Sequence, residues 1–92
     1  MQLVEFDPRK DDENVRKHGI SLKFGEELEW DFSLVWPDNR HAEPRLCALV
    51  PHGATVYFVA FQDRGTVLRM ISIRRSDKQE YDTYVRHAQA NF

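Results

Sequence analysis

The longest stretch of apolar and alternating positions covers residues 54–75 and predicts a β-hairpin. Residues 55–61 are apolar on both parities, which is typical of a strand covered on both faces. Asp63-Arg64-Gly65 predicts a three-residue turn, since glycine accepts a positive φ without a steric penalty. Residues 66–75 then form the predicted return strand, and the rest of the chain is arranged around this hairpin.

Two arginines interrupt the apolar pattern of the return strand. Arg69 lies between Val67 and Ile71 on one face, and burying an unpaired guanidinium costs free energy. We therefore expect a carboxylate, a carbonyl or an anionic ligand beside it. Arg74 lies five positions later, which places it on the opposite face of a regular strand unless a bulge intervenes. The two arginines are thus predicted to have different roles.

The chain before the hairpin predicts two helices and two strands. Residues 2–6 predict a short extended segment, Asp7-Pro8 predicts a helix start, and Gly19 predicts its end. Ser21 is the predicted N-cap of a second helix that extends to about residue 32. Residues 32–36 and 45–50 predict strands, and Pro37 is expected to stop the first of them.

The chain after the hairpin predicts one helix. Ser76-Asp77-Lys78-Gln79 has the pattern of a capping box with Ser76 as N-cap. Apolar residues at positions i, i+3, i+4 and i+7 predict a stripe that faces the sheet, namely Tyr81, Tyr84, Val85 and Ala88. The predicted fold is therefore α+β, with two N-terminal helices, a roughly four-stranded antiparallel sheet and a C-terminal helix.

Length and charge limit the choice of function. A chain of 92 residues predicts a single domain covering residues 1–92, and a formal net charge of −2 argues against a general binder of polyanions. Residues 1–43 hold six Lys/Arg and eleven Asp/Glu, a net −5, whereas residues 44–92 hold seven and four, a net +3. This distribution permits a localised anion site in the second half. An ordinary solvated surface with uneven charges explains it equally well.

Several classes of site and location are not supported by the sequence. No apolar run of about eighteen residues and no signal-peptide pattern is present, so we expect a cytoplasmic protein. The single cysteine, Cys47, excludes an internal disulfide and a cysteine-based metal site, and it is interpreted as an inert core residue. The four histidines lack the spacing of zinc ligands, and no glycine-rich phosphate loop is present. No cofactor is expected.

The remaining residues that could carry chemistry are mainly arginines, interspersed with His, Glu and Tyr, a composition that suits a phosphodiester. They are Arg40, His41, Glu43, Arg45, Arg64, Arg69, Arg74, Arg75, Glu80 and Tyr84. Most have two interpretations. Arg69 either binds substrate or forms a structural ion pair with Glu43 or Glu80. Arg74 lies beside a helix N-terminus, where anions are favoured.

The other candidates also remain open between a functional and a structural interpretation. His41, beside Glu43 in a polar loop, is either a general acid or base or an exposed loop histidine. Tyr84 is either a core residue or a catalytic one. Lys17 and His18 are either functional cations or cations that favour the C-terminal end of a helix.

In chain order, several of these residues and a number of others form a pattern. Its pieces are Phe6-Asp7-Pro8 with Lys10, Asn14, Lys17-His18-Gly19-Ile20-Ser21, Asp38 with Arg40-His41, Glu43, Arg45, Arg64-Gly65, Arg69-Met70-Ile71-Ser72, Arg74, Glu80 and Tyr84. The pattern resembles the BrnT family of type II toxin–antitoxin ribonuclease toxins, whose fold is similar to that of the RelE toxins. The resemblance covers nearly the whole chain.

The resemblance implies an mRNA-cleaving endoribonuclease that inhibits translation, needs no metal and is neutralised by a cognate antitoxin. In such an enzyme the ribose 2′-hydroxyl attacks the adjacent phosphate. The match supplies positions, to which we assign roles by inference: Arg64, Arg69 and Arg74 bind the phosphate or its transition state, His41 or Glu43 transfers the proton, and Tyr84 positions substrate. The expected substrate-binding residues are Lys17, His18, Arg40 and Arg45.

Two other functions remain open from the sequence. The first is a non-catalytic interaction module of the same fold, which acts with a DNA-binding antitoxin as an operon repressor. The two proteins could form a higher-order toxin–antitoxin complex. The acidic first half supports it, because that half could complement a basic partner. The second is a small structural subunit with ion-paired arginines in its core.

Overall fold

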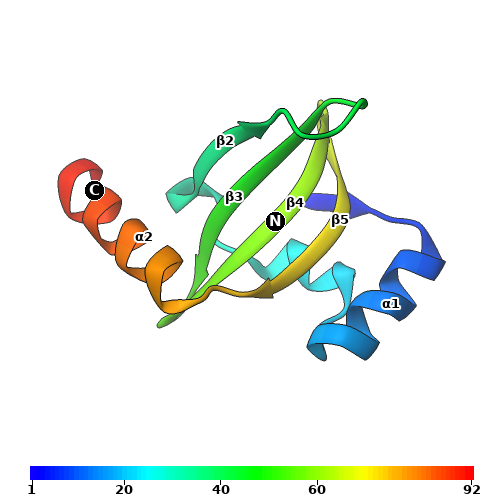
Figure 1. Ribbon diagram of the computed structural model, residues 1–92, viewed down its shortest axis with the longest axis horizontal. Helices are drawn as coiled ribbons and strands as arrows, with labels where there is room; N and C mark the ends of the chain where they lie inside the picture. Colours follow the sequence, from blue (N-terminus) through cyan, green and yellow to red (C-terminus); the bar gives the residue numbers. More distant parts are fainter.

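The computed structural model describes residues 1–92 and contains one five-stranded sheet with helices at both ends (Figure 1). The elements in chain order are β1 (Leu3–Glu5), α1 (Pro8–His18), the 3₁₀ helices η1 (Leu22–Glu27) and η2 (Trp30–Phe32), β2 (Leu34–Asp38), β3 (Arg45–His52), β4 (Thr55–Arg64), β5 (Val67–Arg75) and α2 (Lys78–Asn91). None of the helices combines the length and the apolar character that a membrane span requires.

The predicted α+β class is confirmed, but the predicted sheet of four antiparallel strands is wrong. The strand order is β1-β5-β4-β3-β2, and β1 adds a fifth strand that runs parallel to β5. The segment at residues 2–6 is extended as expected. Its pairing was missed because the partner strand lies far along the chain, where no local pattern reports it.

The predicted second helix is also wrong, since this segment forms the two short helices η1 and η2. Gly25 explains part of the difference. A Cβ atom at this position would lie 2.8 Å from Met70 Sδ, so the segment packs closer to the sheet than an ordinary residue allows. The Gly25 carbonyl then accepts a hydrogen bond from Trp30 Nε1 at 2.7 Å, which fixes the turn between η1 and η2.

Three smaller boundaries differ from the prediction. β2 continues through Pro37 to Asp38, because it is an edge strand and tolerates a missing N–H. The hairpin turn is Gly65-Thr66, with Gly65 at φ 83°, because Arg64 still pairs with β5. The capping box of α2 uses Asp77 and Glu80 in place of Ser76 and Gln79. Helix α1, by contrast, begins after Asp7 and ends at Gly19 as predicted.

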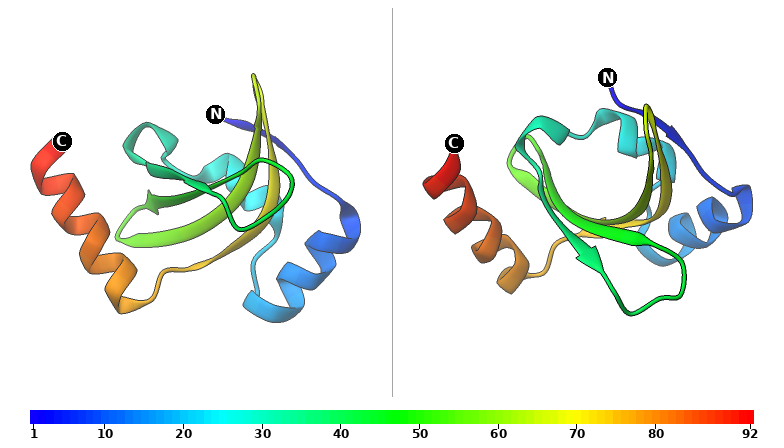
Figure 2. Two further views of the ribbon diagram at one scale, coloured as in Figure 1. Left: turned by 45° about the horizontal axis from the view of Figure 1, so that its top comes forward. Right: turned by 90° about the horizontal axis from the view of Figure 1, so that it is seen from above.

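The main hydrophobic core lies on one face of the sheet, which curls towards η1 and η2 (Figure 2). Its largest fully buried members include Leu22, Val59, Met70 and Ile73. The second face is covered at one end only, by α2. There Tyr84 packs with Leu49 and Val56, and Ala88 lies against them. The predicted apolar stripe of α2 is therefore confirmed at Tyr84 and Ala88 but not at Tyr81, whose exposed fraction is 41%.

Arg69 and Arg74 do not point to opposite faces, as they would in a regular strand, because β5 contains a bulge. Ser72 pairs with Ala60 and Met70 pairs with Phe61, so Ile71 is an extra residue with no partner on β4. The alternation of side chains shifts at this point. Both arginines consequently lie on the second face, while Met70 and Ile73 stay in the main core.

Asn14 holds α1 against the part of β5 that β1 does not reach. The residue is 4% exposed, and its side-chain amide donates to the carbonyls of Ile73 and Ile20 at 2.8 Å each. Its Oδ1 accepts from the N–H of Ile73 at 3.1 Å. One side chain thus satisfies both backbone groups of an edge residue, in place of a neighbouring strand.

Substitution Asn14→Ala is expected to lower the free energy of unfolding by about 2–4 kcal/mol, because it removes three buried hydrogen bonds and leaves backbone groups unpaired. Urea denaturation of the wild type and the variant measures the effect. Glu13→Ala is the matched control on the solvent side of the same helix and should change stability by less than about 0.5 kcal/mol. Equal losses in both variants would show that Asn14 has no special role.

Candidate active site

The second sheet face is uncovered between α2 and the β4–β5 turn, and side chains from four strands are displayed there. We call this surface the open face. Its residues, taken from the strand register, are Trp36, Asp38, Arg45, Cys47, Phe58, Ala60, Gln62, Arg69, Ser72 and Arg74. A cavity of about 490 Å³ lies on it, lined by Trp36, Pro37, Asp38, Asn39, Arg40, Cys47, Phe58, Arg74 and Glu80. We call it the Arg74 cavity.

Arg74 is held in one orientation by three groups. Its Nη1 and Nη2 donate to the two carboxylate oxygens of Glu80 at 2.8 and 2.9 Å, and Nη1 also donates to the Arg75 carbonyl at 3.3 Å. Its guanidinium carbon lies 4.4 Å from the ring centroid of Phe58. Glu80 in turn accepts the N–H of Asp77 at 2.9 Å, so the N-terminus of α2 fixes the position of the arginine.

One edge of the Arg74 guanidinium remains available. The Nε–H and one Nη2–H find no acceptor in the protein, and they form a pair of donors that suits two oxygens of a phosphate. The hydrogen bonds between the partners raise the pKa of Arg74 and lower the pKa of Glu80. Both groups are therefore charged at neutral pH, and the arginine can bind an anion without first being reoriented.

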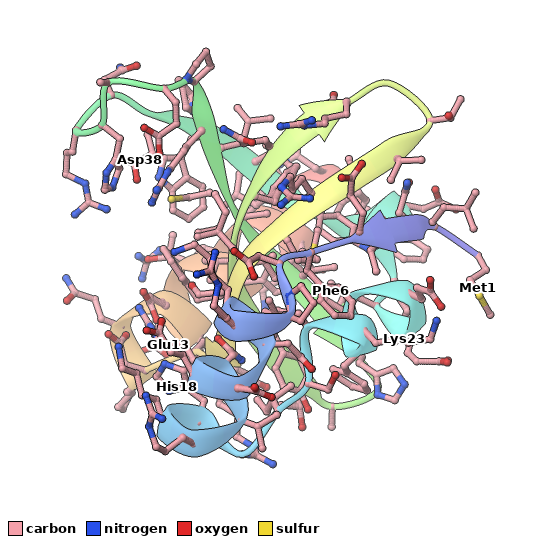
Figure 3. All side chains as sticks on the ribbon, turned by 90° about the vertical axis from the view of Figure 1, so that its right-hand side faces the viewer. Met1, Phe6, Glu13, His18, Lys23 and Asp38 are labelled. Atoms are coloured by element: carbon pink, nitrogen blue, oxygen red, sulfur yellow. The ribbon has the colours of Figure 1, made fainter.

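Asp38 organises the loop between β2 and β3. Its side chain is nearly buried, and Arg40 donates to it from Nε at 2.9 Å, from Nη2 at 3.2 Å and from its backbone N–H at 3.2 Å. These bonds hold the pKa of Asp38 well below its usual range. His41 Nε2 lies 3.5 Å from the same carboxylate. Figure 3 shows Asp38 beside the projecting loop.

His41, Glu43 and Arg45 form a second group at this loop. Arg45 donates from Nε to Glu43 Oε1 at 2.7 Å, and its Nη1 lies 3.5 Å from His41 Nε2. A hydrogen bond from its own backbone N–H and then the bonds from Arg45 lower the pKa of Glu43, so this side chain is a carboxylate at neutral pH. No other residue donates a hydrogen bond to the Oε2 atom of Glu43.

The group of His41, Glu43 and Arg45 lies next to the Arg74 cavity on the open face. A cavity of about 380 Å³ is lined by residues of the second group and shares Pro37, Asp38 and Asn39 with the Arg74 cavity. Four predicted site residues are therefore brought together around Asp38 and its loop, namely Arg40, His41, Glu43 and Arg45. Arg74 adjoins these four residues.

Arg69 lies on the same face but outside both cavities. It donates from Nη1 to Glu5 Oε2 at 2.7 Å, so the expected carboxylate partner is confirmed. The partner is Glu5 of β1, however, and neither Glu43 nor Glu80. The sequence pattern could not show this, because the parallel pairing of β1 with β5 places Glu5 opposite Arg69. Its remaining N–H groups have no acceptor in the protein.

The other predicted site residues lie outside both cavities. Arg64 is at the exposed end of β4, on the same face as Gln62, which it contacts. Tyr84 donates its hydroxyl to the Phe32 carbonyl at 2.6 Å, and burial raises the pKa of this hydroxyl. It is thus a core residue in this structure. Lys17 and His18 end α1, and His18 lies far from Asp38 on the same side of the molecule (Figure 3).

Trp36, Phe58 and Asp38 line the Arg74 cavity but were not predicted as site residues. The strand register shows why they belong together, since Trp36 and Asp38 alternate along β2 and point to the face that holds Phe58. The sequence offered no local signal for this pair, because the predicted strand stopped at Pro37 and the facing residues come from other strands. Cys47 also borders the cavity; burial raises the pKa of its thiol, which therefore stays protonated and agrees with the prediction of an inert cysteine.

No three side chains of His, Cys, Asp or Glu are grouped in a way that would hold a metal ion. A search of curated proteins found no match. One protein family, described as ribonuclease toxin, BrnT, of type II toxin-antitoxin system, has a sequence pattern that matches residues 6–80. The chain belongs to the BrnT family.

Membership of the BrnT family confirms the resemblance found in the sequence and identifies a ribonuclease toxin whose partner is a cognate antitoxin. The matched segment contains the Arg74 cavity and ends at Glu80, the residue that holds Arg74. Tyr84 lies beyond it. The likeness to the fold of the RelE toxins stays a prediction.

The ion pair of Arg74 and Glu80 predicts a pH-dependent stability. The pKa of Glu80 is below its ordinary value of 4.5 in the folded protein, so its ionisation stabilises the fold above that pH. This contribution is lost as the pH falls through the lowered pKa. Glu80→Gln should therefore lower the free energy of unfolding by about 1–2 kcal/mol at pH 7 and by less at pH 3.

Urea denaturation at a series of pH values between 7 and 3 measures this difference. Asp82→Asn is the matched control, since Asp82 forms an exposed ion pair with Lys78 on the same helix, and such pairs contribute little. A Glu80→Gln effect that is the same at both pH values would contradict the proposed coupling.

Proposed function

We propose that this BrnT-family protein is a metal-independent endoribonuclease that cleaves mRNA on the open face of its sheet. The observation that carries the proposal is the fixed guanidinium of Arg74, whose free edge is directed at no group of the protein. A donor that is oriented before substrate binds can stabilise charge on a phosphoryl oxygen without reorganisation. Arg40 and Arg45 are the further phosphate-binding residues of the same surface.

The proposed reaction is attack by a ribose 2′-hydroxyl on the adjacent phosphate. Glu43 accepts the proton of the 2′-hydroxyl, because it is ionised and no other residue donates to its Oε2. The new bond joins O2′ to phosphorus, the bond from phosphorus to O5′ breaks, and His41 donates a proton to the leaving O5′. The products are a 2′,3′-cyclic phosphate and a 5′-hydroxyl. Arg69 is assigned to a neighbouring phosphate, since it shares the face with Arg74.

The proposed regulation is neutralisation by a DNA-binding antitoxin, which with the toxin represses their operon. The net charge of −5 over residues 1–43 supports a basic surface on the partner. In the free protein each arginine of the two cavities is already paired with a carboxylate, as in Arg40 with Asp38. This pairing favours a second candidate function, a non-catalytic module that only binds its partner. A cleavage assay distinguishes this module from the ribonuclease.

Arg74→Ala is expected to reduce the cleavage rate of a defined RNA by about 10²–10³-fold, because it removes an oriented donor from the transition state. Arg74→Lys keeps the charge but loses the fork geometry and should recover only part of the rate. The assay uses purified, antitoxin-free protein in excess EDTA, with a 2′-deoxy oligonucleotide as a substrate that cannot react. Arg86→Ala, an exposed arginine of α2, is the control.

Cleavage of the RNA alone, by the wild type and by Arg86→Ala, is the expected result. Full activity of Arg74→Ala would remove Arg74 from the mechanism. A folded wild type that cleaves no RNA, free or ribosome-bound, would favour the non-catalytic module.

Glu43→Gln and His41→Asn should each reduce the cleavage rate by about 10²–10⁴-fold and remove one limb of the pH–rate profile, the acidic limb for Glu43 and the basic limb for His41. The reason is that Glu43 must be deprotonated and His41 protonated in the proposed reaction. Rates measured between pH 4 and pH 9 test the assignment. A bell-shaped profile that is unchanged in either variant would contradict it.

A further inference from the structure

Trp36 is a large aromatic residue that the fold leaves uncovered inside the Arg74 cavity. It lies on the edge strand β2 and is 36% exposed. Its indole Nε1–H donates to no group of the protein, whereas the Nε1–H of Trp30 donates to the Gly25 carbonyl. Trp30, by comparison, packs against Phe61 of the main core at 5.2 Å. Packing of the protein's own core therefore accounts for Trp30 but not for the exposure of Trp36.

The neighbours of Trp36 fix where its indole lies. Its ring centroid is 5.9 Å from that of Phe58, with the rings inclined at 62° in an edge-to-face contact. Phe58 in turn lies 4.4 Å below the guanidinium carbon of Arg74. The order Trp36, Phe58, Arg74 thus crosses β2, β4 and β5 on one face, and all three residues line the same cavity.

This row combines the two features that a nucleotide requires. The free donor edge of Arg74 suits the phosphate, and an exposed indole suits the flat face of a base, which stacks on aromatic side chains whatever its sequence. The cavity of about 490 Å³ lies within the size range of small-ligand sites. The unpaired Nε1–H adds a donor that can reach a polar atom of the base or ribose.

We propose that Trp36 is the stacking platform for the nucleobase next to the phosphate that Arg74 binds. The inference rests on the proposed function, because it assigns a base-binding subsite to the same cavity. Phe58 is the positioning residue that supports both Trp36 and Arg74. Since stacking tolerates every base, the subsite contributes affinity and register, and discrimination among sequences through it is modest.

A fluorescence titration tests the stacking directly. In a Trp30→Phe protein Trp36 is the single tryptophan, and an uncleavable 2′-deoxy oligonucleotide is expected to quench its emission on binding. An abasic oligonucleotide of equal length keeps the phosphates and removes the bases, so it should quench weakly and bind at least about fivefold less tightly. Both titrations are done at one stated salt concentration, because phosphate contacts depend on salt.

Variants at the platform give the second measurement. Trp36→Ala should raise the KM for RNA cleavage by about fivefold or more, and Trp36→Phe should recover most of the loss because it keeps an aromatic face. Val35→Ala is the matched control: Val35 is the preceding residue of β2, is 44% exposed and points to the other side of the strand. It should leave KM unchanged.

The outcomes separate this inference from the proposed function. If Trp36→Ala cleaves RNA like the wild type, or if the abasic oligonucleotide binds and quenches as well as the intact one, the stacking platform is overturned while the ribonuclease stands. The open indole would then be a protein-binding surface. If the wild type neither cleaves RNA nor binds either oligonucleotide, the proposed function fails and the subsite fails with it.

Discussion

The extra residue in β5 is the constraint on which the open face depends. Because Ile71 has no partner on β4, side-chain alternation shifts, and Met70 and Ile73 both reach the main core although they are three positions apart. The same shift brings Arg69 and Arg74 to one face. In a regular strand one of the two arginines would point into the main core, where an unpaired guanidinium is costly, and the open face would lose that arginine.

The second feature of the site is that its charged groups are oriented by the fold. Glu80 connects Arg74 to the first turn of α2, and Asp38 connects Arg40 to the end of β2. On the opposite edge, Asn14 anchors α1 to β5 and so completes the sheet. The arrangement reduces the entropy lost when a phosphate binds, but it also neutralises much of the positive charge. A localised site on an acidic protein follows from this balance.

Local patterns predicted the elements and failed on the contacts between distant parts of the chain. The caps of α1 and the central hairpin were readable because their signals lie within a few residues, and Arg74 was a candidate because it lies at a strand end beside a helix N-terminus. The parallel pairing of β1, the bulge at Ile71 and the pairing of Arg69 with Glu5 were not readable, because each depends on tertiary register. Trp36 was missed for the same reason, since its neighbours come from β4 and β5.

The most direct test of RNA binding at the open face is an NMR titration of the Nε–Hε resonances of the arginines. The structure leaves the Nε–H of Arg74 without an acceptor, so an uncleavable 2′-deoxy oligonucleotide should shift this signal strongly, and it should leave the signal of Arg86 on α2 unchanged. An unchanged Arg74 signal in a protein saturated with oligonucleotide would show that nucleic acid binds elsewhere.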